Sequence, residues 1–176
     1  MAATGHPTRR WLAMAALTLG AVCALPAGTA SAATIDAAGW WSRTSTPLPL
    51  TPTAPHVEDG QLHVQGQPEG PTAVAALRWT LAEGERSPVL AITPADGSLV
   101  PADAVVTACR AATPWQEAKG GAWDDAPEAD CATSVEGAVA DDGSTIEFDL
   151  GTLVDGTTLD IVLTPGPGST VSLTFD

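Results

Sequence analysis

The residues best suited to chemistry lie close together in one segment of the chain. Trp115 and Trp123 are followed by Asp124 and Asp125, within a stretch rich in small residues. An exposed indole ring can stack on the apolar C–H face of a sugar, and neighbouring carboxylates can accept hydrogen bonds from its hydroxyls. These four residues are therefore candidate ligand-binding residues for a carbohydrate. The alternative is that both rings pack on an edge of the fold and hold the segment in place.

The acidic residues of the same segment are candidates for calcium binding. Asp124, Asp125, Glu128 and Asp130 fall within seven residues, and Ca²⁺ prefers several oxygen ligands. However, the segment lacks the central glycine and the terminal glutamate of an EF-hand loop. We therefore interpret it as a solvated acidic loop, and we expect no metal site and no cofactor.

The histidines give little indication of catalysis. After position 32 the chain contains only His56 and His63. His56 lies in a proline-rich stretch, and His63 lies on the polar face of a predicted strand beside two glutamines. No motif such as G-x-S-x-G or H-E-x-x-H places a nucleophile or a metal next to a base. We therefore expect a protein that is not an enzyme.

The first 32 residues have the features of an export signal. A pair of arginines precedes an apolar run of about fifteen residues, from Trp11 to Leu25, and an A-x-A motif ends at Ala32. This pattern predicts a signal peptide over residues 1–32, cleaved between Ala32 and Ala33, and hence a secreted or extracellular protein. The arginine pair leaves both the general and the twin-arginine export routes open.

Removal of this signal leaves two of the three cysteines. Cys23 lies in the apolar run, whereas Cys109 and Cys131 remain in the mature chain. An even number of cysteines in an exported protein predicts a disulfide, because the compartment is oxidising. Two free thiols are the alternative. The predicted bond closes a loop of about 22 residues, which stabilises the folded state by about 3 kcal/mol in the chain-entropy model.

The mature chain is strongly acidic. All 21 acidic residues follow position 32 but only 5 of the 7 basic residues do, so the net charge after cleavage is near −16. Like charges repel, so we expect neither nucleic acid nor an anionic membrane surface as a partner, and no membrane span in the mature chain. Cell-wall polysaccharide or another envelope protein remains as a partner. The abundance of Ala, Gly, Pro, Thr and Asp is common in high-GC bacteria.

The mature chain divides into two parts with different patterns. Residues 33–59 contain Trp40-Trp41 followed by four prolines, which disfavour both helix and central strand. We expect an extended segment whose tryptophans either pack back onto the domain or form an exposed contact. Residues 60–176 instead show short alternating runs separated by turn residues, which predict a β-sandwich domain.

The alternating runs predict about seven or eight short antiparallel strands and no amphipathic helix. Turn signals recur roughly every 8–12 residues, a spacing typical of all-β sandwiches and jelly rolls. We therefore predict an all-β fold, a β-sandwich or jelly roll with one disulfide. The predicted strands cover residues 61–65, 73–81, 89–93, 105–109, 134–140, 145–150, 159–163 and 171–175.

Several of these strands carry a family resemblance. The motif Leu77-Arg78-Trp79, followed by the alternating aliphatics Leu90 and Ile92, resembles the first strands of the DNRLRE domains of extracellular bacterial proteins. The later elements of the pattern correspond to Trp115, Trp123, Pro127 and the run Phe148-Asp149-Leu150-Gly151-Thr152-Leu153-Val154.

This resemblance covers roughly residues 60–176 and implies a jelly-roll fold on the cell surface. Two departures stand out: Thr80 replaces the usual aspartate after the aromatic residue, and the cysteine pair is not part of the general pattern. The family brings no fixed set of ligand residues, so none is transferred. We therefore expect a secreted or cell-surface module with a non-catalytic structural or binding role, or alternatively a carbohydrate-binding module that uses the Trp115/Trp123 loop.

Overall fold

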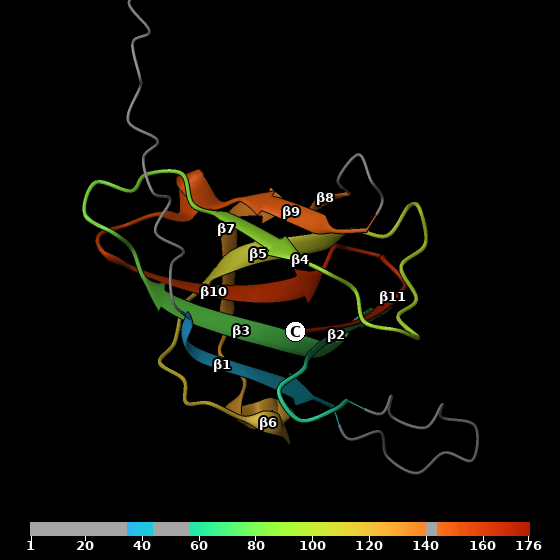
Figure 1. The fold of residues 1–176 in the computed structure, drawn as a ribbon. Helices are drawn as coiled ribbons and strands as arrows, with labels where there is room; N and C mark the ends of the chain where they lie inside the picture. Colours follow the sequence, from blue (N-terminus) through green and yellow to red (C-terminus); the bar gives the residue numbers. More distant parts are fainter. Residues whose placement is uncertain (1–34, 44–56, 140–143) are drawn as a thin grey trace, which may run out of the picture. The chain divides into compact units, whose positions relative to one another are not determined.

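The described part of the protein consists of strands and two short 3-10 helices. A computed structural model describes residues 35–43, 57–139 and 144–176 (Figure 1). The predicted signal peptide, 1–32, its cleavage site and His56 lie outside the described residues. The elements are β1 (Ile35–Ser42), β2 (Leu62–Gln67), β3 (Gly70–Thr80), β4 (Val89–Ile92), β5 (Val106–Ala111), β6 (Lys119–Ala122), η1 (Trp123–Asp125), β7 (Ala129–Glu136), β8 (Ala138–Val139), β9 (Ile146–Asp149), η2 (Leu150–Leu153), β10 (Thr158–Pro165) and β11 (Val171–Phe175).

Strand β3 organises the larger of two sheets, which has eight strands. One edge of β3 pairs with β1, and the opposite edge pairs first with β2 and then with β10. The sheet continues from β2 to β11 and from β10 to β5 and β7, all antiparallel. Only β6, which adds to the other edge of β1, runs parallel to its neighbour. Strands far apart in the sequence therefore lie side by side.

The smaller sheet has three strands in the order β4-β9-β8. Alternate residues of both sheets point into one main core, where full burial of each large aliphatic or aromatic side chain contributes roughly 1.5–3 kcal/mol. Figure 1 shows β4 in front of β5, with β9 above β4. The largest core residues with almost no exposure are Leu77, Ile92, Phe148, Leu150, Leu153, Leu159, Ile161, Leu163, Leu173 and Phe175.

A second hydrophobic cluster covers the other face of the large sheet. We call it the outer cluster; its buried members are Trp41, Val74, Ala76, Trp115 and Val162. It explains why the middle of β3 is apolar on both faces, because a strand covered on both sides requires apolar residues at successive positions. Strand β3 therefore contributes to two separate cores.

These findings confirm a mostly-β fold with two sheets and one disulfide. The described residues contain no α-helix, and nothing helical among them has the length and hydrophobicity of a membrane span. All eight predicted strand regions overlap observed strands, but the described residues contain eleven strands in total. The prediction of seven or eight strands omitted β1 and β6 and placed the start of the strand after Cys131 too late.

Strand β1 was not predicted because its sequence does not alternate. Ala38 and Trp40 pack against the main core, while Trp41 points to the outer cluster, so apolar residues occur on both faces. Small residues within it have low intrinsic strand propensity. Gly39 is required for packing, since a Cβ there would lie 2.8 Å from the backbone nitrogen of Ala118.

The disulfide joins Cys109 on β5 to Cys131 on the neighbouring strand β7. Cys109 is fully buried, whereas Cys131 is exposed. The bond confirms the predicted pairing and closes the segment that carries Trp115 and Trp123.

Removing this disulfide is expected to lower the stability of the fold. In the variant Cys109→Ala/Cys131→Ala, the free energy of unfolding falls by about 3 kcal/mol, because the unfolded chain regains the entropy of an open loop. Urea unfolding measures the loss. A reducing agent should destabilise the wild type to a similar degree and leave the double variant unchanged; equal stabilities of oxidised and reduced wild type would contradict the prediction.

Candidate functional site

Trp115 is held on all sides by protein contacts. Its side chain is 7% exposed and meets Trp41 edge to face, with ring centroids 5.7 Å apart and planes at 88°. Its Nε1–H donates a hydrogen bond to Asp160 Oδ1 over 3.1 Å. An indole in this position is anchored to the sheet and offers almost no free face to a sugar.

An ion pair completes this anchor. Arg78 on β3 and Asp160 on β10 are direct partners across the two strands. The Arg78 Nε–H donates to Asp160 Oδ1 over 2.7 Å, and the guanidinium lies 4.9 Å from the centroid of the Trp115 ring. Both charged side chains are about one third exposed, at 32%, so solvent weakens their attraction. Their main effect is to fix the orientation of the indole.

Trp123 lies in η1 and packs against the outer cluster while remaining half-buried. The Arg43 guanidinium lies 4.3 Å from the centroid of its ring, a cation–π contact. Asp124 and Asp125 follow it and are exposed. The structure therefore brings Trp115 and Trp123 to the same face of the large sheet, but only Trp123 and the two aspartates reach solvent.

Asp130 and the backbone of Glu128 take part in local hydrogen bonds. Asp130 Oδ1 accepts a hydrogen bond from the backbone N–H of Ala132, and the backbone N–H of Glu128 donates to the hydroxyl of Thr113. Within the described ranges, no three His, Cys, Asp or Glu side chains are grouped so that they could share a metal ion.

His63 is buried, and its prediction on a polar face was wrong. It is 1% exposed, its Nδ1 lies 3.1 Å from Thr174 Oγ1, and its ring meets Trp40 edge to face at 5.6 Å. Strand β11 lies beside it and pairs Thr174 with His63, a long-range contact that the local sequence does not indicate. Its Nε2 has no hydrogen-bond partner among the described residues. Burial lowers the pKa of His63 below 6.5, and a backbone hydrogen bond at Leu173 opposes the shift.

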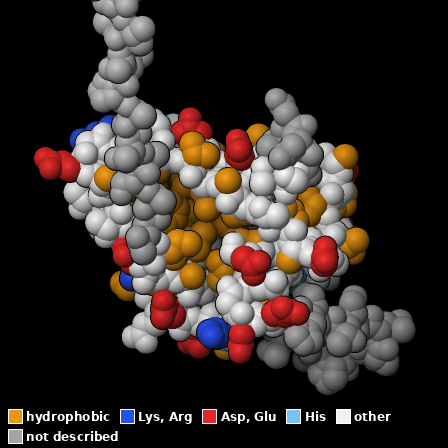
Figure 2. Space-filling model, in the orientation of Figure 1, with side chains coloured by type: hydrophobic (Ala, Val, Ile, Leu, Met, Phe, Trp, Pro, Cys, Tyr) orange, Lys and Arg blue, Asp and Glu red, His pale blue; other side chains and the backbone are white. Residues whose placement is uncertain are grey.

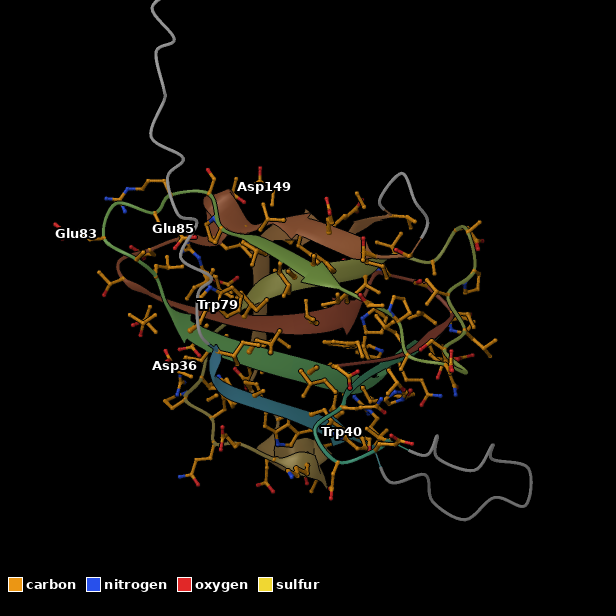
Figure 3. The ribbon with its side chains drawn as sticks, viewed as in Figure 1. Asp36, Trp40, Trp79, Glu83, Glu85 and Asp149 are labelled. Carbon is orange, nitrogen blue, oxygen red and sulfur yellow. A yellow bond between two sulfur atoms is a disulfide. The ribbon has the colours of Figure 1, made fainter. Side chains whose placement is uncertain are left out.

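A hydrophobic hollow lies where the small sheet leaves the main core uncovered. Ala38 and Leu90 pack against the main core yet stay partly exposed. Figure 2 shows hydrophobic side chains gathered in a recess of this face, between the β4–β9 side and the β3–β1 side. Figure 3 places Trp79, which is 5% exposed, in the same region. We call this surface the hollow.

Acidic residues lie towards one end of the hollow. Figure 3 shows Asp36, Glu83, Glu85 and Asp149 to the left of Trp79 or above it. Asp149 also caps η2 by accepting a hydrogen bond from the Gly151 N–H, and Asp36 accepts one from the Thr80 hydroxyl. An apolar floor with carboxylates at one end is suited to a ligand that has both apolar surface and positive charge or hydroxyl donors. The sequence did not predict this site, because β1 was not predicted.

Comparisons with protein-family models and with curated proteins find no match to this chain. Its own residues are therefore the only guide to its function. Two surfaces of the described structure are candidates: the half-buried Trp123 with its aspartates, and the hollow with its acidic end.

The two tryptophans of the segment are expected to differ in their effect on stability. Trp115→Ala removes a buried ring and its hydrogen bond to Asp160, so the free energy of unfolding falls by about 3–5 kcal/mol. Trp123→Ala removes a half-exposed ring and a cation–π contact with Arg43, at a cost of about 1 kcal/mol. Urea unfolding of both variants measures the difference. Equal losses would mean that Trp123 is as much part of the core as Trp115.

Burial of His63 is expected to make the fold less stable in mild acid. Because its pKa is lowered in the folded state, the unfolded chain binds a proton more readily below pH 6.5. The free energy of unfolding should therefore fall as the pH decreases from about 6.5 towards the lowered pKa. Above that range, His63 should cause no change of stability with pH. The variant His63→Gln should show a shallower fall in Tm with pH than the wild type. An unchanged slope in His63→Gln would contradict this.

Proposed function

We propose that this chain is a secreted or cell-surface module of the jelly-roll type, with a non-catalytic role in binding or structural attachment. The observation that carries the proposal is the hollow, where Ala38 and Leu90 pack against the main core but remain partly exposed. Apolar side chains left uncovered beside a folded core favour a partner that covers them. The export pattern of residues 1–32 and the disulfide fit an oxidising, extracellular setting.

The jelly-roll assignment is supported by the order of the strands. Strands that are not consecutive in sequence lie beside each other, as in the pairs β2–β11, β3–β10 and β4–β9, which is typical of Greek-key connections. The resemblance to DNRLRE domains adds to this support, because Leu77-Arg78-Trp79, Leu90 and Ile92 fall within strands.

The acidic charge of the chain narrows the class of partner. A net charge of −14 for the whole sequence disfavours nucleic acid and anionic membrane surfaces. Cell-wall polysaccharide and another envelope protein remain as the partners of the proposed module. Either could present hydroxyl or cationic donors to the carboxylates beside the hollow.

A carbohydrate-binding module based on the Trp115/Trp123 loop is the second candidate function. It is favoured by the half-buried ring of Trp123 beside the exposed Asp124 and Asp125. Of the two tryptophans, only Trp123 could stack on a sugar, since Trp115 is buried. Saturable binding to cell-wall polysaccharide that is lost in a folded Trp123→Ala variant would favour this candidate over the hollow.

Blocking the hollow is expected to weaken the binding of cell-wall polysaccharide or an envelope protein. The variant Ala38→Arg places a long charged side chain on the partly exposed floor, while Ala132→Arg adds the same side chain at an exposed position of β7. Residues 33–176 should bind purified cell-wall polysaccharide or an envelope protein saturably, with at least about tenfold weaker binding in Ala38→Arg and no change in Ala132→Arg. Circular dichroism checks that both variants fold. Wild-type affinity in a folded Ala38→Arg variant would exclude the hollow as the binding surface.

A further inference from the structure

Strand β4 has an unpaired edge beside the hollow. Among the described residues it pairs only with β9, on the opposite side, over Val89 to Ile92. An unpaired strand edge presents main-chain N–H and C=O groups that can pair with another strand. This edge therefore has the polar groups needed for recognition of an extended polypeptide.

The register shows which main-chain groups are available. The Leu150 N–H donates to the Pro88 C=O, so Pro88 and Leu150 form a hydrogen-bonded pair of the β4–β9 ladder. Hydrogen-bonded and non-hydrogen-bonded pairs alternate along antiparallel strands. The N–H and C=O groups of Val89 and Ala91 consequently point away from β9, towards the unpaired edge.

The side chains of β4 alternate between buried and exposed positions. Ile92 is buried and Leu90 partly buried in the main core, whereas Val89 is 62% exposed. A strand added beside β4 would follow the same alternation. Every second side chain of that strand would cover the hollow, and the others would lie on the outer face of the small sheet.

The outer face beside this edge is acidic. Glu147 and Asp149 on β9 are exposed and lie directly opposite Ala91 and Val89. The carboxylates beside the hollow add to this negative charge. Arg86 is the cation in the turn before β4, and its guanidinium donates a hydrogen bond to the backbone C=O of Glu85. On the outer face, an added strand would have Val89 and Ala91 as its direct neighbours, with Glu147 and Asp149 one strand further on, at roughly 9–10 Å. Long Lys or Arg side chains span that distance, and their charge is attracted by these carboxylates. The edge is therefore suited to a strand that carries Lys or Arg on its outward positions.

We propose that the unpaired edge of β4 binds an extended segment of a basic partner polypeptide by strand addition, with apolar side chains in the hollow and long Lys or Arg side chains that extend across β4 towards Glu147 and Asp149. This inference rests on the proposed function, because it assigns a protein partner to the hollow. A second copy of this chain is the less suitable occupant, since it would bring the same acidic residues against each other.

A defined peptide tests the proposal. The probe is a fluorescein-labelled peptide of alternating Val and Lys, and its binding to residues 33–176 is followed by fluorescence anisotropy. The wild type should bind it saturably, more weakly as salt increases, and at least about tenfold more tightly than a peptide of alternating Val and Glu. Equal affinity for the two peptides would overturn the proposed charge recognition.

Proline variants test the pairing of main-chain groups. Ala91→Pro removes an N–H that points to the unpaired edge, and Ala129→Pro does the same at the outer edge of β7, where the Ala112 N–H to Glu128 C=O bond sets the register. Proline is tolerated at such edge positions. Binding of the Val/Lys peptide should fall at least about tenfold in Ala91→Pro and stay unchanged in Ala129→Pro. Unchanged binding in a folded Ala91→Pro variant would overturn strand addition.

The variant Ala38→Arg separates this inference from the proposed function. It blocks the hollow for any ligand, whereas Ala91→Pro blocks only main-chain pairing. Loss of binding in Ala38→Arg alone would uphold a binding module and overturn strand addition, and loss in neither variant would overturn both. A wild-type dimer in sedimentation analysis that Ala91→Pro converts to a monomer would assign the edge to a second copy and overturn the basic partner.

Discussion

The structure depends on covering both faces of β3. Leu77 and Trp79 point into the main core, and Val74 and Ala76 point into the outer cluster. A strand in this position gains apolar contacts on two sides, and its main-chain groups are paired by β1, β2 and β10. Other elements bury this strand on each of its two faces.

The two covers are built differently. On the outer face, Trp41, Trp115 and Trp123 cover the sheet with large rings carried by β1 and by the disulfide-closed segment. On the inner face the cover is a sheet of three strands against one of eight. At roughly 4.8 Å per strand, the small sheet is too narrow to cover its larger partner. The hollow beside Ala38 and Leu90 follows from this difference in width.

The sequence predicted the strands in which apolar and polar residues alternate over at least part of their length, as in the second half of β3, and failed where they do not. Alternation identified the regions of β2, β3, β9 and β11, and cysteine counting identified the Cys109–Cys131 bond. It could not identify β1, whose apolar residues serve two cores, nor the burial of His63 between Trp40 and a neighbouring strand more than 100 residues away. Burial by distant partners leaves no local pattern. For the same reason the hollow, which needs β1, was not predicted.

The residue types of β4 do not indicate that its edge could bind a partner. Tryptophans mark candidate ligand sites, but their large apolar area makes them equally suited to cover a sheet, as Trp115 does. An unpaired strand edge has no such signal, because main-chain groups recognise the partner. Soluble proteins protect such edges with short strands, prolines and charges. Here the strand is short, Pro88 precedes it, and Glu147 and Asp149 lie beside it. These carboxylates repel a second acidic chain and favour a basic segment, so protection against self-association and selection of a partner follow from the same charges.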